Sequence, residues 1–420
     1  MNPSHLAVLV LALVLAKAGV QFWLNRLNRR HARAHAGSIP EALRETMDEA
    51  TYAKSVDYTL ARNAFSAFSL GWSVVLLVAV LFSGALPWFF DWYKSQVGGG
   101  HWSMAGFLVL VPLVLSVFSL PLGWYGQFRL EERFGFNTTT PATWWADWAK
   151  GLVLSLILGW PMAALVLWLI AASDWWWIWA WGSVMVFQLL MVILAPQIIM
   201  PLFNKFTPLP DGPLKDRLLA LGERTGFNAH TIQVMDGSRR SRHSNAFFTG
   251  FGRWRKIVLF DTLIEQLGEA ELEAVLAHEI GHYKKGHIPK SMALSAVGTL
   301  VGFWVLSLLI DQPLLVEAFG FTHAASQPAP APALLLLALL GGTVFFWLTP
   351  LANLLSRRYE YEADAYAAEA MGGTDSMVGA LRKLAEQNLS NLVPHPVFSW
   401  VYYSHPTLLE REQALGNQPA

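Results

Sequence analysis

Two histidines four residues apart, with a glutamate directly after the first, are the residues of this sequence best suited to catalysis. They are His278, Glu279 and His282. If the segment is helical, both imidazoles lie on one face and can bind a single cation, while Glu279 lies beside the water that the cation would hold. This H-E-x-x-H spacing predicts one zinc ion per chain, with Glu279 accepting the water's proton. The alternative is a surface helix that carries two histidines by chance.

The surrounding residues predict a helix over residues 269–287. Glutamates occupy its first turns and two lysines lie near its end, the charge order that the helix dipole favours. Catalytic zinc usually has three protein ligands. A histidine six residues after His282, as in metzincins, is excluded because position 288 is isoleucine. His287 is one residue short of that position, and we interpret it as an ordinary polar residue at the helix end.

The candidate third ligand is Glu360, on a separate helix. Asp364 follows four residues later and shares its helix face. Glu360 is therefore predicted to bind the metal, while Asp364 orients a ligand histidine by a hydrogen bond. Glu362 points elsewhere and is interpreted as a solvated surface charge.

The composition indicates a membrane protein, because 54% of the residues are hydrophobic and only 14% are charged. A membrane-spanning helix needs about 20 mostly apolar residues. Runs of this kind cover residues 5–24, 65–92, 103–125, 150–172, 175–199, 291–311 and 333–355. The first could instead be a signal peptide, although no Lys or Arg precedes it, and the third to fifth could be partly re-entrant. The last two form a helical hairpin that returns Glu360 to the membrane face of the histidines.

The distribution of Lys and Arg predicts the orientation, since these residues are retained in cytoplasmic loops. They are frequent after the first and third runs, whereas the loops after the second, fourth and sixth hold only Lys94. The N-terminus is thus predicted outside and the active site in the cytoplasm, with the chain in the inner membrane of a bacterium or the endoplasmic reticulum of a eukaryote. We divide the chain into spans 1–5 (1–199), a catalytic segment (200–290), spans 6 and 7 (291–355) and a segment with the third ligand (356–420).

Short β-prone runs at residues 231–235, 244–250 and 256–260 predict a small antiparallel sheet, with a hairpin turn at Asp236-Gly237. The edge of such a sheet can hold an extended peptide beside the metal; the alternative is a purely structural sheet. A net charge of zero gives no indication of a nucleic-acid partner. The absence of cysteine excludes disulfides and cysteine ligands.

Several motifs in their order along the chain resemble the type I CAAX prenyl proteases. These motifs are Glu131-Glu132-Arg133-Phe134-Gly135-Phe136-Asn137, Ser244-Asn245-Ala246-Phe247-Phe248, the H-E-x-x-H helix, Arg358-Tyr359-Glu360-Tyr361-Glu362-Ala363-Asp364, and Ser404-His405-Pro406 with Leu408-Leu409-Glu410-Arg411. The resemblance extends from the first loop to the C-terminus and includes the count of seven spans. The chain is similar to a compact, bacterial-type member of that family.

The resemblance implies a mainly α-helical, seven-span barrel that encloses a large chamber, with the zinc site at its cytoplasmic end. It also implies that His405 stabilises the oxyanion and that Arg411 supports the site. Residues Asn245, Ala246 and Phe247 would bind the substrate, a peptide or protein that is either prenylated or unmodified. Membrane lipids are the other expected partners.

The sequence therefore predicts a zinc-dependent endopeptidase of CAAX type at the membrane face. One alternative keeps the chemistry but assigns it to general quality control of membrane proteins, as in proteases of the HtpX type, which have fewer spans. Another is a noncatalytic membrane chamber or transporter with a residual zinc site. The presence of Glu279 beside both histidines favours catalysis over this last reading.

Overall fold

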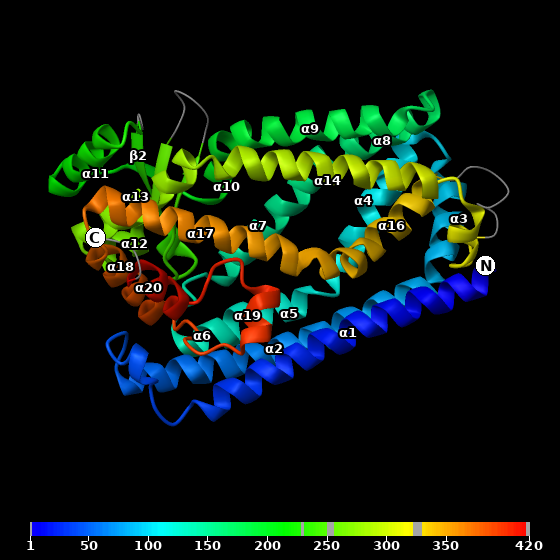
Figure 1. Cartoon of the computed structure of the whole chain (residues 1–420). Helices are drawn as coiled ribbons and strands as arrows, with labels where there is room; N and C mark the ends of the chain where they lie inside the picture. The colour runs from blue at the N-terminus through cyan, green and yellow to red at the C-terminus, as the bar shows by residue number, and fades with distance from the viewer. Residues whose placement is uncertain (1, 228–230, 250–255, 322–329, 417–420) are drawn as a thin grey trace.

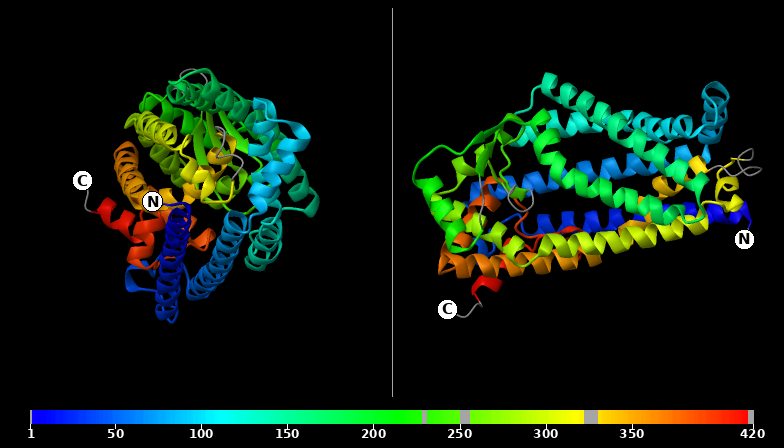
Figure 2. Two further views of the ribbon diagram at one scale, coloured as in Figure 1. Left: turned by 90° about the vertical axis from the view of Figure 1, so that its right-hand side faces the viewer. Right: turned by 90° about the horizontal axis from the view of Figure 1, so that it is seen from above.

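Long helices run lengthwise through the molecule, and a small sheet lies at one end of them (Figure 1). The computed structural model describes residues 2–227, 231–249, 256–321 and 330–416. The first helix begins at the end opposite the sheet, and the last described helix lies at the same end as the sheet (Figures 1 and 2). The two ends of the chain are therefore at opposite ends of the helical bundle.

The helical bundle is formed by two groups of helices that are far apart in the sequence. The first group comprises α1 (Pro3–Ala34), α2 (Glu49–Phe82), α3 (Ala85–Val97), α4 (His101–Val117), α5 (Leu120–Tyr125), α6 (Glu132–Phe134), α7 (Pro141–Leu154), α8 (Trp160–Ala172), α9 (Trp176–Leu194) and α10 (Met200–Phe203). The second comprises α14 (His287–Leu309), α15 (Pro313–Glu317), α16 (Pro330–Phe345) and α17 (Thr349–Met371). Three π-helical segments continue helices of the first group: η2 (Gly126–Glu131), η3 (Ser155–Gly159) and η4 (Ala195–Ile199).

Six helices of the described residues are long and apolar enough to cross a membrane. A seventh crossing is formed if α4 and the helical stretch Leu120–Phe134, which bend by 46° at their junction, count as one span. This confirms the predicted membrane architecture. The predicted second span, 65–92, is too long: α2 ends at Phe82, and Gly84, with φ +78°, turns the chain into the separate helix α3.

Packing within the bundle follows the apolar surfaces of these helices. Helix α1 packs against α2, and α4 packs against α8, which in turn contacts α9. The helix α14 packs against α9, while α16 packs against α4. Helix α14 runs away from the sheet end of the bundle, and α16 and α17 run back to it, as predicted (Figure 1). The helices of this pair of spans pack against α9 and α4 of the first group. Large apolar side chains such as Val301 and Trp304 remain exposed on α14, where lipid would cover them.

The sheet consists of β1 (Phe206–Pro208), β2 (Thr231–Met235), β3 (Ala246–Thr249) and β4 (Lys256–Phe260), in the order β1-β2-β4-β3. Residue 250 of the predicted second strand lies outside the described residues. The prediction of an antiparallel sheet is wrong for the central pair, because β2 and β4 are parallel and the sheet is mixed. The hairpin predicted at Asp236-Gly237 is also wrong. A short helix, η5 (Gly237–Arg239), follows β2 instead, and the chain passes to β3 on the far side of β4.

Helices pack around this sheet to form a second hydrophobic core, separate from that of the membrane bundle. They are α11 (Pro213–Arg224), α12 (Asp261–Gln266), α13 (Glu269–Lys284), α18 (Asp375–Gln387) and α20 (Leu408–Gly416). Helix α19 (Pro396–Tyr402) packs against α17 and α1 instead. The short helices η1 (Glu41–Leu43) and η7 (Phe346–Leu348) complete the described helical elements. Helix α13 is central to this core, since it packs against α17, α18, α11 and β3.

Candidate metal centre

Helix α13 carries both histidines and is held by contacts at its beginning and along its length. The Glu271 side chain accepts a hydrogen bond from the backbone N–H of Gly268 at 2.7 Å, which caps the first turn. The carboxylate of Glu273 is buried and is paired with Arg217 and Arg224 of α11. These contacts fix the rotation of α13 about its axis, because a buried carboxylate needs its cationic partners.

The end of α13 differs from the prediction. The helix stops at Lys284, and Gly286, with φ +68°, breaks it before α14 begins at His287. His287 is therefore the first residue of α14, a helix long and apolar enough to cross a membrane, and not the end of the histidine helix.

A close approach of α13 to α17 brings the predicted ligands together. At Gly281, a Cβ atom would lie 3.0 Å from Ala363 Cα and 3.1 Å from the Ala363 carbonyl oxygen. Only glycine permits the two backbones to lie so near each other. Since Gly281 lies between the two histidines in the sequence and Ala363 lies between Glu360 and Asp364, this contact places all four side chains at one point.

The ring nitrogens and carboxylate oxygens of His278, His282 and Glu360 lie within 4.8 Å of one another. The two histidine Nε2 atoms are 3.1 Å apart, and they lie 3.5 Å and 3.4 Å from the Glu360 oxygens. Two ligand atoms of a tetrahedral zinc ion lie about 3.3 Å apart, given bonds of about 2.0–2.1 Å. Glu360 Oε2 is also buried without a hydrogen bond from any described residue. These observations fit a metal ion at this point.

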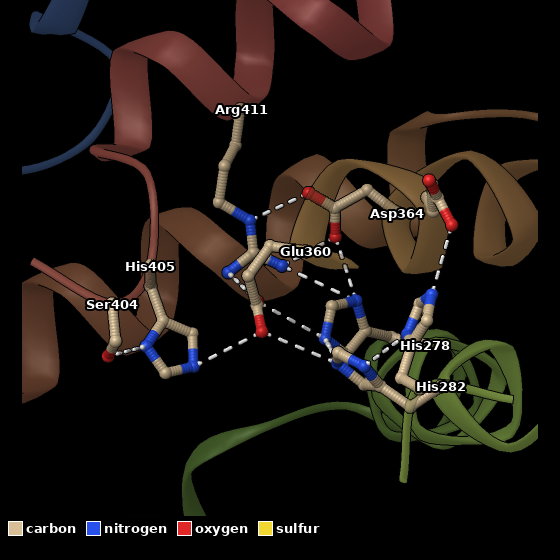
Figure 3. A network of polar contacts seen from close by, with 9 residues as sticks. His278, His282, Glu360, Asp364, Ser404, His405 and Arg411 are labelled. Carbon is tan, nitrogen blue, oxygen red and sulfur yellow. Dashed lines mark hydrogen bonds and ion pairs between the residues drawn. The ribbon is translucent and has the colours of Figure 1, made fainter. Parts of the chain in front are cut away.

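The other ring nitrogen of His278 contacts Asp364, with Nδ1 2.8 Å from Oδ1 (Figure 3). Arg411, from α20, donates its Nε–H to the second oxygen of Asp364 at 2.7 Å. Burial disfavours a charged His278, but its hydrogen bonds to Asp364 and Glu360 outweigh this effect and raise its pKa to about 9. Nδ1 of His278 is thus occupied, and Nε2 faces Glu360.

His282 is held by two residues that were not predicted to take part in the site. Its Nδ1 lies 2.9 Å from Nδ1 of His287, whose Nε2 lies 3.1 Å from a carboxylate oxygen of Glu362. His287 is buried, and Glu362 is also paired with Arg358 at 3.0 Å. The interpretations of His287 as an ordinary polar residue and of Glu362 as a solvated charge are therefore wrong. The break at Gly286, which turns His287 back toward His282, is the reason.

Glu279 lies next to His278 on α13 and is partly exposed. Burial raises the pKa of its carboxyl above the ordinary value, although the nearby histidines act in the opposite direction. A carboxylate with a raised pKa is better suited to accept a proton near neutral pH.

His405 approaches the carboxylate of Glu360 from the C-terminal segment (Figure 3). Its Nε2 lies 3.4 Å from Glu360 Oε1, and its Nδ1 lies 3.0 Å from the Ser404 hydroxyl. The His405 side chain is 64% exposed, so it can contact a substrate as well as the site. The two residues inferred from resemblance both lie beside Glu360, because a guanidinium nitrogen of Arg411 is 3.6 Å from its other oxygen, Oε2.

The predicted substrate segment lies at the edge of the sheet. Strand β3 is the last strand in the sheet order and pairs only with β4 among the described strands. Asn245 directly precedes β3 and is exposed, and its carbonyl accepts a hydrogen bond from Phe260 N–H. Ala246 and Phe247 pair with Leu259 and Val258 of β4. Helix α13 packs against β3, so this edge strand lies next to the histidine helix.

A cavity of about 780 Å³ lies between α2 and the C-terminal segment, and its lining includes two residues that contact the metal ligands but not the ligands themselves or residues 245–247. His405 and Arg411 line it near the metal ligands, while Tyr58 and Arg62 of α2 line it farther along. A histidine pair and a buried glutamate beside a cavity, on a bundle of apolar helices, are the features of a membrane metallopeptidase.

Comparison with known proteins agrees with this class. The profile described as CAAX prenyl protease N-terminal, five membrane helices, matches residues 28–205, and that of peptidase family M48 matches residues 208–418. The mouse CAAX prenyl protease 1 homolog is 33% identical, with 97% of this chain and 95% of its own covered. CAAX prenyl protease 1 of Saccharomyces cerevisiae is 35% identical, with 92% and 90% covered. The crystal structure of S. mikatae Ste24p has a TM-score of 0.88 at 32% identity, covering 97% of this chain and 98% of that one.

The chain belongs to peptidase family M48, in the group of the CAAX prenyl proteases. It is a multi-pass membrane protein and a metalloendopeptidase, as the sequence predicted.

Proposed function

We propose that this protein hydrolyses peptide bonds at the membrane face with one zinc ion held by His278, His282 and Glu360. The observation that carries the proposal is the set of distances among these three side chains, together with the buried Glu360 oxygen that has no hydrogen bond. Two histidines and a carboxylate are a ligand set that favours zinc.

The residues around the metal position have separate tasks in this mechanism. When bound, zinc would polarise the scissile carbonyl and acidify the attacking water. Glu279 accepts the proton of this water and returns it to the leaving amine. His405 donates a hydrogen bond to the oxygen that becomes negative in the transition state. Asp364, itself held by Arg411, keeps Nε2 of His278 directed at the metal.

The substrate in this proposal is the C-terminal peptide of a protein, of CAAX type, bound as an added strand along β3. The free edge of β3 beside α13 supports this placement, and the names of the relatives support the substrate class. Asn245, Ala246 and Phe247 would provide the main-chain contacts. The cavity of about 780 Å³ would take the rest of the peptide.

We also propose that the active site faces the cytoplasm. The end of α1, which carries Arg30, and α6, which carries Arg133, lie toward the sheet end of the bundle, whereas α3, which carries Lys94, lies at the other end with the N-terminus (Figure 1). The rule that positive loops stay inside therefore supports a cytoplasmic sheet and metal centre. The membrane is the inner membrane in a bacterium and the endoplasmic reticulum in a eukaryote.

The test compares the wild type with Glu279→Gln in detergent. Bound zinc is measured in both, together with cleavage of one fluorogenic peptide in farnesylated and unmodified forms. We expect one zinc per chain in both proteins, cleavage only by the wild type, and preference for the farnesylated peptide.

Each contrary result has a definite meaning. Equal cleavage by both proteins, or no stoichiometric zinc in the wild type, would contradict the mechanism and favour a noncatalytic chamber or transporter. Cleavage without any farnesyl preference would leave the mechanism intact but replace CAAX processing by general proteolysis of the HtpX type.

A further inference from the structure

The two histidines of the metal centre are supported in different ways. His278 contacts the carboxylate of Asp364 directly. His282 has a second imidazole, that of His287, between it and the carboxylate of Glu362. Glu360 and Glu362 are two residues apart on α17, so their side chains point about 200° apart around the helix axis. His287, from the start of α14, spans the distance that Glu362 could not cover alone.

The hydrogen positions in this chain of contacts follow from the geometry. Nε2 of His282 faces Nε2 of His278 and Oε1 of Glu360, and must be free of hydrogen to bind a metal. A neutral imidazole carries one N–H, so the hydrogen of His282 is on Nδ1. Its partner at 2.9 Å, Nδ1 of His287, must then accept it. The hydrogen of His287 is consequently on Nε2, which lies 3.1 Å from the accepting oxygen of Glu362.

The two outer members of this chain are themselves held in place. The His287 ring stacks on Tyr359 with a centroid distance of 4.1 Å and an angle of 11° between the planes. Its side chain is almost fully buried, which fixes the ring's position. Arg358 donates its Nε–H to the other oxygen of Glu362 at 3.0 Å.

We propose that His287 and Glu362 are positioning residues that select the tautomer and ring orientation of His282 and thereby strengthen metal binding. The inference rests on the proposed zinc centre and adds two residues to it. Hydrogen-bond partners of ligand histidines typically contribute 10- to 100-fold to metal affinity. The imidazole of His287 lies between the ligand His282 and the carboxylate of Glu362. It can transmit the effect of this carboxylate on metal affinity, because each of its two nitrogens has one hydrogen-bond partner.

The experiment measures zinc affinity by chelator competition on the metal-depleted full-length protein in detergent, and needs no substrate. His287→Phe keeps an aromatic ring against Tyr359 but removes the acceptor. His287→Asn keeps an acceptor at the position of Nδ1 but removes the ring. Glu362→Met is tested against Glu369→Met, the same change at an exposed position of α17. Thermal unfolding checks that each variant is folded.

We expect His287→Phe to weaken zinc binding by about 10- to 100-fold. His287→Asn keeps the acceptor but loses the contact with Glu362, so it should weaken zinc binding only by the smaller factor expected of Glu362→Met. Glu362→Met should weaken binding by a smaller factor, and Glu369→Met should not change it. Cobalt substitution provides a second readout, since the visible spectrum should change in His287→Phe and not in His287→Asn.

Wild-type affinity in His287→Phe would overturn the inference, as would an equal loss in His287→Phe and His287→Asn. Wild-type affinity in Glu362→Met would remove Glu362 from it. If His287→Phe does not fold, His287→Asn and Glu362→Met decide between these outcomes. A wild type that binds no zinc would overturn the proposed function itself, which distinguishes the two failures.

Discussion

At the scale of single residues, Glu360 and Asp364 differ in how many of their oxygens are already used. Both carboxylates are buried on the same face of α17. Asp364 is saturated, since His278 and Arg411 contact its two oxygens. Glu360 keeps one oxygen without a hydrogen bond, and its other neighbours lie 3.4–3.6 Å away. Glu360 is thus the carboxylate that remains able to bind a cation.

His405 offers a test of catalysis that leaves the metal ligands untouched. We expect His405→Ala to lower kcat about 100- to 1000-fold, because one donor to the oxyanion is lost. Zinc content should equal that of the wild type. His5→Ala, at an exposed position near the N-terminus, is the control. Unchanged turnover of the fluorogenic peptide by His405→Ala would remove His405 from the reaction.

Spacing along a helix was sufficient to predict which residues meet at this scale. His278 and His282 are four residues apart, as are Glu360 and Asp364, and the structure brings these four side chains together. The roles of His287 and Glu362 could not be predicted in the same way. They depend on a break at Gly286 and on a contact between α14 and α17 that no local pattern encodes.

At the scale of elements, the contact between α13 and α17 determines whether a metal site exists. The ligands come from both helices, so their separation sets the distance between the histidines and Glu360. The sequence predicted both helices and their return to the same membrane face. It did not predict the parallel pairing of β2 and β4, because strand propensity says nothing about which strands are neighbours.

Gly281→Ala should separate these two helices. The added methyl would meet the Ala363 backbone at 3.0–3.1 Å, and a backbone cannot move aside as a side chain can. We expect a loss of about 1–3 kcal/mol in the free energy of unfolding, with weaker zinc binding. Gly298→Ala is the matched control in α14, where a Cβ would meet nothing within 4 Å. Equal zinc affinity in both variants, measured by chelator competition, would show that this contact does not set the ligand distances.

At the scale of the whole molecule, the chain begins at one end of the bundle, and α13, which carries both ligand histidines, lies at the other (Figure 1). The positive loops gather at the end with the metal centre, as the distribution of Lys and Arg predicted. The sequence contains no cysteine, so a single introduced cysteine reports the position of one residue.

Labelling of single cysteines tests the orientation. Ser4→Cys lies near the N-terminus, and Asp211→Cys lies at the sheet end; both positions are exposed. A maleimide that cannot cross membranes should label Ser4→Cys in sealed right-side-out vesicles. Asp211→Cys should react only after detergent is added. The opposite pattern would place the active site outside the cytoplasm.

The break at Gly286 also fixes the height of the reaction above the lipid. His287 begins α14, a helix long and apolar enough to cross a membrane, and it contacts His282 directly, so the metal position lies beside the first turn of that helix. A protein that is anchored in the same bilayer presents each of its peptide bonds at a particular height. The enzyme would then select the peptide bond by its distance from the membrane anchor of the substrate. We expect the cleavage position to shift by one bond when one residue is inserted between the anchor and the scissile bond.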